Sequence, residues 1–94
     1  RERNLQPVVI RINKKALPFI ENQKYYSGFV SQKEVRDKME MTFLATSMEG
    51  FGRWFMTFGD QAEIIEPEEL KTWVLYQLEA IAESLKQPAK KQTA

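Results

Sequence analysis

Alternation of apolar and polar residues marks three strands in the chain. Residues 7–13 form a run rich in β-branched side chains between turn-forming residues, which predicts a strand with Val8, Ile10 and Ile12 on its buried face. Residues 39–45 alternate from Met39 onward and predict a second strand with one buried face. Residues 62–66 predict a third, shorter strand.

The segment that follows the first strand predicts a short helix and then a stretch that fits two structures. Asn13 is expected to cap a helix that runs to about Glu21. Residues 25–30 fit either a strand or an aromatic loop, and Gly28 indicates a bulge or bend within them.

Ser47 is expected to begin a second helix of about three turns, and Gly59 stands where a left-handed C-terminal cap belongs. Gly52 inside this helix costs about 1 kcal/mol relative to alanine, so we expect a neighbour to approach its backbone closely. The aromatic residues at helical spacing are Phe51, Phe55 and Phe58.

The last helix has the clearest pattern. Pro67 suits the first helical position, and Glu68 and Glu69 complement the helix dipole in the first turn. Pro88 prevents any continuation of the helix. A buried apolar face is predicted from residues at helical spacing, namely Leu70, Val74, Leu78, Ile81 and Leu85.

Taken together, the elements follow the order β-α-β-β-α-β and then a helix. This order predicts an α+β fold, a ferredoxin-like two-layer sandwich with an added C-terminal helix. The domain is expected over residues 7–86. Residues 1–6 look like a linker from an upstream domain, because the stretch is polar and begins with Arg1. Residues 87–94 are expected to be a disordered tail.

The composition narrows the function. The 94 residues suffice for one domain, and 43% hydrophobic with 29% charged residues is typical of a globular protein. The formal net charge of +1 gives no electrostatic basis for strong non-specific DNA binding. No apolar run approaches the roughly 20 residues that span a bilayer, so no membrane partner is expected.

Catalytic chemistry is not expected. The chain has no histidine and no cysteine, which removes the usual general base, thiol chemistry and the commonest zinc ligands. The carboxylates of Glu66, Glu68 and Glu69 cluster at a helix start, where the dipole alone accounts for them. We therefore expect neither an enzyme nor a bound cofactor or metal.

Two groups of residues suggest a ligand or partner surface. Arg53 and Trp54 either have structural roles or form a lip that holds an anionic or nucleobase ligand by charge and stacking. Trp73 and Tyr76 lie beside the apolar stripe of the last helix, where they either widen its buried face or anchor another domain.

Arg11 points away from the buried face of the first strand. In a two-layer fold that face of the sheet is open unless something covers it. The face is expected to combine apolar residues with Arg11, Glu40, Thr42 and Glu63. Such a mixed face is either solvated or a docking surface.

The segment from Phe55 to Leu70 resembles the C-terminal extension of WYL-domain transcription regulators, which is called the WCX domain. In that family a helix ends in a Phe-Gly turn, a short strand ending in Glu-Pro follows, and a leucine lies in the first turn of the next helix. The resemblance extends over nearly the whole chain. The positions that match this motif are structural ones, namely Phe58, Gly59, Pro67 and Leu70, and Phe58 and Leu70 are expected to be buried.

The resemblance implies a bacterial, cytoplasmic parent with an N-terminal winged-helix domain, a middle WYL domain and this C-terminal domain. In such proteins the WYL domain senses a ligand, with nucleotides or single-stranded nucleic acid as expected effectors, and the C-terminal domain supports homodimerisation. DNA is then a partner of the parent and not of this chain. The ligand residues of the WYL signature do not occur here, and the resemblance assigns no role to Arg11 or Arg53.

A function from another class stays open at this point. The chain also fits a free-standing ferredoxin-like module that binds a nucleotide or an amino acid between subunits. The polar start of the chain favours a regulator domain, and the full open reading frame distinguishes the two.

Overall fold

The computed structural model describes residues 4–89. Its strands and helices follow one another as β1 (Gln6–Asn13), η1 (Lys14–Ala16), α1 (Leu17–Ile20), η2 (Lys24–Ser27), β2 (Phe29–Val35), β3 (Lys38–Ala45), α2 (Met48–Met56), η3 (Gly59–Gln61), β4 (Ala62–Glu66) and α3 (Glu68–Lys86).

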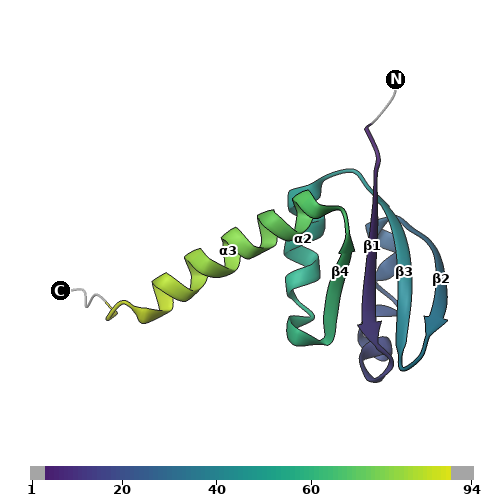
Figure 1. Ribbon diagram of the computed structural model, residues 1–94, viewed down its shortest axis with the longest axis horizontal. Coiled ribbons are helices and arrows are strands. Elements are labelled where there is room, and N and C mark those ends of the chain that lie inside the picture. The colour runs from purple at the N-terminus through teal and green to yellow at the C-terminus, as the bar shows by residue number, and fades with distance from the viewer. Residues whose placement is uncertain (1–3, 90–94) are drawn as a thin grey trace.

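The strands form one four-stranded antiparallel sheet in the order β2-β3-β1-β4. The fold is therefore α+β, as the sequence predicts. Figure 1 shows α2 and the short helical segments on one side of the sheet, with α3 leaving its β4 edge. Within the described residues no helix covers the other side of the sheet.

The core lies between the sheet and the helices. Alternate residues of β1 and β3 face it, so the predicted buried faces of both strands are confirmed. Phe51 and Phe55 of α2 cover the core on the side opposite the sheet, and Ile20 of α1 covers it at one end. The fully buried large side chains are Phe43, Ile10, Ile12, Ile20, Met41, Leu70 and Val8.

The connection between β1 and β2 differs from the prediction. Asn13 makes no side-chain capping bond, and its Nδ2 donates to Gln61 Oε1 at 3.0 Å. The predicted single helix is a 3₁₀ turn followed by a short α-helix, with Pro18 in its first turn. Residues 25–30 divide between a 3₁₀ turn and a strand, and Gly28 makes the bend between them with φ of 89°.

The second helix follows the prediction closely. Ser47 caps it, since its Oγ accepts a hydrogen bond of 3.0 Å from the amide of Gly50. Gly59 has φ of 59°, the left-handed conformation expected after the helix. A Cβ on Gly52 would lie 2.5 Å from Trp73 Cζ3, which identifies the close neighbour that the sequence predicts.

The predicted buried face of α3 is correct for its first half only. Leu70 and Val74 are buried against the core, but Leu78, Ile81 and Leu85 are 48%, 46% and 79% exposed. The helix begins at Glu68 with Pro67 as its cap, one residue later than predicted. Helical spacing defines a face of a helix, but the sheet is too small to cover all of this one.

The chain ends need one correction. β1 begins at Gln6, so the last residue of the predicted linker is already paired with β3. The remainder of that prediction falls partly on residues 1–3, and the predicted tail falls partly on residues 90–94, both outside the described residues. Between residues 4 and 89, no helix has the length and apolar character to cross a membrane.

Candidate functional site

Arg11 stands at the centre of the open face of the sheet. The strand register sets it opposite Glu40 on β3 and opposite Glu63 on β4. Its Nε donates a hydrogen bond of 2.9 Å to Glu40 Oε1. The side chain of Arg11 is 35% exposed and that of Glu40 is 17% exposed, so this pair is partly shielded from solvent. The structure thus brings these three residues together on one face, as the alternation predicts.

Two lysines extend this charged strip. Lys33 Nζ lies 3.7 Å from Glu40 Oε2, and Lys38 Nζ lies 3.8 Å from Glu63 Oε2. We call the surface made by Arg11 and these four charged residues the Arg11 face. Exposed lysine side chains in ion pairs at 3.7 Å and 3.8 Å add little stability, so a partner that brings its own charges can exchange with the lysines at small cost.

A shallow cavity of about 200 Å³ borders the Arg11 face on the side of β2. It is lined by Ser31, Gln32, Lys33, Glu40 and Thr42. The lining is polar and small, and it suits a side chain or backbone group of a docking partner better than a drug-sized ligand.

Arg53 and Trp54 do not form a common lip. The indole of Trp54 packs edge-on against three phenylalanines of the core, and its Nε1 donates a hydrogen bond of 2.9 Å to Gln23 Oε1. Arg53 is exposed, with its guanidinium carbon 5.4 Å from the centre of the Trp73 ring. Adjacent residues of a helix point about 100° apart, so the two side chains reach different neighbours.

Trp73 and Tyr76 also separate. Trp73 is half-buried against Gly52 and carries Arg53 on its ring, so it widens the buried face of α3. Tyr76 is 68% exposed. Of the two, Tyr76 is the residue available to an external partner.

The motif residues have structural positions. Leu70 is fully buried, as predicted. Phe58 is only half-buried, at the edge of the core against Trp54, so the predicted burial is met only in part. Gly59 supplies a positive φ and Pro67 the cap of α3. The motif therefore fixes the α2–β4–α3 path and supplies no chemistry of its own.

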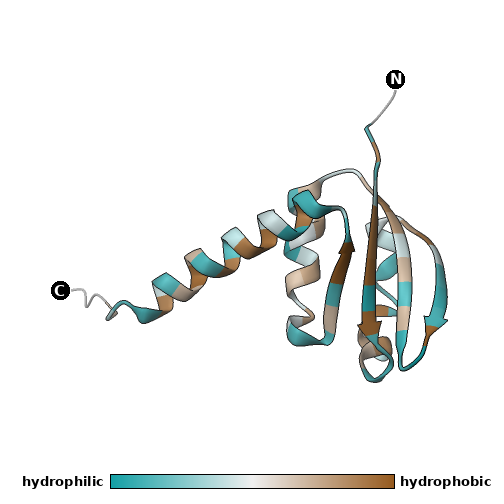
Figure 2. Ribbon diagram, in the orientation of Figure 1, coloured by the Kyte–Doolittle hydropathy of each residue, from teal (hydrophilic) through white to brown (hydrophobic). Residues whose placement is uncertain are grey.

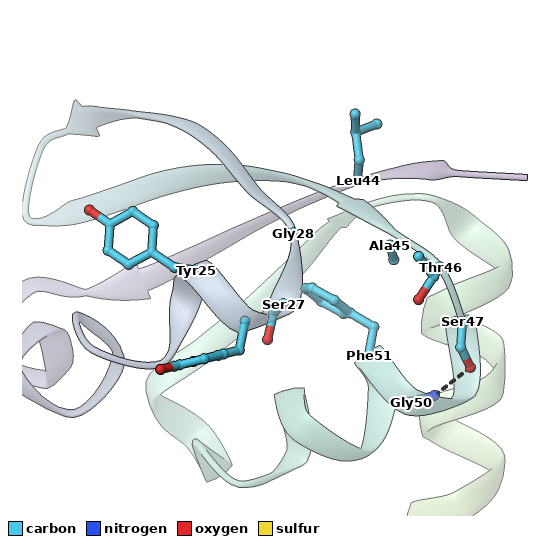
Figure 3. A pocket seen from close by; sticks show the side chains of 10 residues that line it. Tyr25, Ser27, Gly28, Leu44, Ala45, Thr46, Ser47, Gly50 and Phe51 are labelled. Carbon is cyan, nitrogen blue, oxygen red and sulfur yellow. Dashed lines mark hydrogen bonds between the residues drawn. The ribbon is translucent and has the colours of Figure 1, made fainter. Parts of the chain in front are cut away.

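Two cavities among the helices are features that the sequence did not predict. One of about 390 Å³ lies between the η2–β2 corner and the start of α2. Figure 3 shows Tyr25, Ser27 and Phe51 bordering it, whereas the Leu44 side chain points away from it. A Cβ on Gly28 would overlap the Leu44 carbonyl, so this corner requires glycine. The lining offers hydroxyl groups and no charge.

The second cavity, of about 480 Å³, lies where α1 meets the end of α2. Phe19, which is 70% exposed, forms one wall, and Phe58 forms another. Both cavities depend on contacts between segments distant in the sequence. No local pattern could have indicated them.

Lys24 is a buried charge that no pattern in the sequence indicated. Its side chain is 5% exposed, and its Nζ lies 2.8 Å from Glu21 Oε1 and 2.7 Å from Gln32 Oε1. The same nitrogen lies 4.3 Å from the centre of the Phe29 ring. All of its polar contacts are met, so Lys24 ties η2 to β2 and is not poised for chemistry.

Among residues 4–89 no group of three or more acidic, histidine or cysteine side chains is arranged to hold a metal ion. In this part of the chain, the features available for contact with other molecules are the Arg11 face, the two cavities among the helices and the exposed second half of α3.

Comparison with protein-family models identifies the family of this chain. The family model described as the WCX domain matches residues 4–82, which is most of the chain. No curated protein matches the chain.

Proposed function

From the premise that this chain belongs to the WCX domain family, we propose that it is the C-terminal regulatory and dimerisation domain of a bacterial transcription regulator. The parent carries a winged-helix domain that contacts DNA and a WYL domain that binds the effector, a nucleotide or single-stranded nucleic acid. It acts in the cytoplasm. This chain supports effector sensing and assembly through its surfaces.

The strand order supports the ferredoxin-like part of the proposal. Followed from its other edge, the sheet is β4-β1-β3-β2, with every neighbour antiparallel. Each crossover then places one strand between the two that it joins, as a split βαβ unit does. A sheet of this kind leaves one face without helices, and that face is available to the rest of the parent.

The observation that carries the proposal is the Arg11 face. A strip of charges paired across all four strands lies on an uncovered sheet face. Complementary charges select a partner and its orientation, even where they add little affinity. We assign this face to the contact with the neighbouring WYL domain or protomer.

The net charge of +1 is consistent with a domain that contacts protein and leaves DNA binding to another domain. Affinity for duplex DNA depends mainly on cations that displace counterions from phosphates. A nearly neutral domain lacks this favourable contribution to DNA affinity, so we assign the DNA contact to the winged-helix domain.

The test is Arg11→Glu in the full-length regulator. The reversal brings a third negative charge beside Glu40 and Glu63. We expect weaker assembly or a weaker response to effector, with a normal thermal melt. Sedimentation of wild type and variant, and a DNA-release assay with effector, measure the two effects.

Lys15→Glu is the matched control, because it reverses an exposed charge beside the α1 cavity and off the Arg11 face. It should leave both measurements unchanged. If Arg11→Glu behaves like this control, the Arg11 face is simply solvated and the proposal loses its support.

A further inference from the structure

The second half of α3 has an apolar face that no other part of residues 4–89 covers. Leu75, Leu78, Ile81 and Leu85 are 57%, 48%, 46% and 79% exposed. Figure 1 shows this half projecting away from the sheet and from α2, and Figure 2 shows hydrophobic bands continuing along it. A contiguous exposed apolar surface on a folded domain marks an interaction site.

The spacing along this face is that of a helix-pairing seam. Leu75, Leu78, Ala82 and Leu85 are separated by three, four and three residues, the interval at which two helices interlock side chains. We call these four residues the α3 seam. Ile81 widens it on the side of the domain body, and Glu79 lies at its opposite edge. No charged residue falls on the seam itself between Leu75 and Leu85.

The seam is complementary to itself when two copies run in opposite directions. Leu75 then lies opposite the partner's Leu85, and Leu78 lies opposite the partner's Ala82. One two-fold axis generates all four contacts, as a closed dimer requires. The small Ala82 facing the large Leu78 lets the two surfaces interdigitate.

The helix dipoles and the position of the domain body select this direction over the parallel one. Two antiparallel helices have opposed dipoles, which is the favourable arrangement. The domain body sits at one end of α3, so opposite directions also keep the two bodies apart.

We propose that the exposed half of α3 pairs with the same segment of a second copy of this chain, in an antiparallel helix dimer along the α3 seam. The inference rests on the proposed assembly role and specifies its surface. The seam is four layers long and smaller than a standard interface, so its dissociation constant belongs in the micromolar to millimolar range. Within a larger parent, other contacts add to it.

Sedimentation equilibrium of the 94-residue chain over a wide concentration range tests the pairing. A monomer–dimer equilibrium is expected, and Leu78→Glu should raise the dissociation constant at least tenfold, because it buries two like charges near the two-fold axis. Ala80→Glu is the matched control, since it adds the same charge to an exposed position on the far side of the same helix. It should leave the constant within about twofold of wild type.

Helix direction is tested by cysteine cross-linking, because the chain has no cysteine of its own. An equal mixture of the Leu78→Cys and Ala82→Cys chains should form a disulfide between the two variants, since these positions are neighbours across an antiparallel seam. Leu78→Cys alone should form little. A strong disulfide from Leu78→Cys alone would indicate parallel helices and overturn the proposed arrangement.

Glu79→Gln provides a third readout. An antiparallel pair brings Glu79 near the partner's Glu79 at the seam edge, so removing the charge should tighten the dimer. A chain that stays monomeric up to millimolar concentration, or that weakens equally with Leu78→Glu and Ala80→Glu, rejects the inference. Arg11 lies far from this helix in the sheet, so the test of the proposed function can still succeed if the seam fails.

Discussion

In the first half of α3, Leu70 and Val74 are buried under the sheet and α2, and Trp73 lies against the backbone of Gly52. In the second half, Leu78, Ile81 and Leu85 continue the same spacing but lie in solvent. The two halves have the same apolar pattern and the same helical conformation. They differ only in whether another element lies within reach.

The difference separates two roles of apolar residues. Those of the first half hold the domain together. Those of the second half contribute little to the fold of a single chain and remain available to a partner. The apolar stripe of a helix therefore shows how much of the helix surface is suited to burial. The size of the neighbouring layer decides how much of that stripe becomes part of the domain core.

The largest expected loss of stability comes from truncating a buried side chain in the first half of α3. Leu70→Ala should lower the free energy of unfolding by about 2–5 kcal/mol, because it removes a fully buried side chain and leaves a cavity. Leu78→Ala, the same truncation two turns later, should change it by less than about 0.5 kcal/mol in dilute solution. Urea denaturation of both variants measures the contrast, and equal losses would mean that the second half also belongs to the core.

Gly52→Ala should cause the next largest loss of stability. The added methyl would lie 2.5 Å from Trp73 Cζ3, and overpacking of this kind costs about 1–3 kcal/mol, more than the gain in helix propensity. Gly50→Ala on the same helix meets only the Ser47 side chain at 3.4 Å or more and should be neutral or stabilising. Thermal melts distinguish them, and a stabilised Gly52→Ala chain would show that Trp73 is free to move aside.

Arg53→Ala tests a weaker anchor of the first half. Its guanidinium lies 5.4 Å from the Trp73 ring, a cation–π contact worth about 0.5–1 kcal/mol at an exposed position. Arg53→Lys should retain part of that energy. Tryptophan fluorescence during unfolding reports both, and an alanine variant as stable as wild type would assign Arg53 wholly to solvent.

The smallest effect is expected from removing the end of the helix. A chain ending after Ala80 loses only exposed residues of the described part, so its unfolding free energy in dilute solution should change by less than about 0.5 kcal/mol. A larger loss would show that the two halves are energetically coupled. Chemical denaturation at two protein concentrations separates that coupling from assembly.

Local patterns predicted much of the fold. Alternation in residues 7–13 and 39–45 gave the strands with the correct buried face, because the period of a strand is independent of its surroundings. Ser47 marked the start of the second helix through its own hydrogen bonding, and Gly59 has the expected positive φ but lies three residues beyond the last helical residue, Met56. Asn13 was expected to cap a helix, but its side chain makes no capping bond and instead bonds Gln61, which is distant in the sequence.

The candidate site was predictable to a smaller extent. Alternation alone set Arg11 on the open face with Glu40 and Glu63, and the register then made them neighbours. Arg53 and Trp54 were grouped because they adjoin in sequence, yet tertiary packing sends one to Trp73 and the other to Gln23. Adjacency along a helix does not determine which neighbours the side chains meet.

The sequence by itself determined the elements, their buried faces and the resemblance that the family match bears out, because periodicity, caps and turn residues act over a few positions. Only the tertiary structure decided where the core ends. It buried Leu70 and left Leu78 exposed, enclosed Lys24 beside Phe29, and shaped the cavity between η2 and α2. Burial depends on what the rest of the chain brings within contact distance, and that information is not local to any segment.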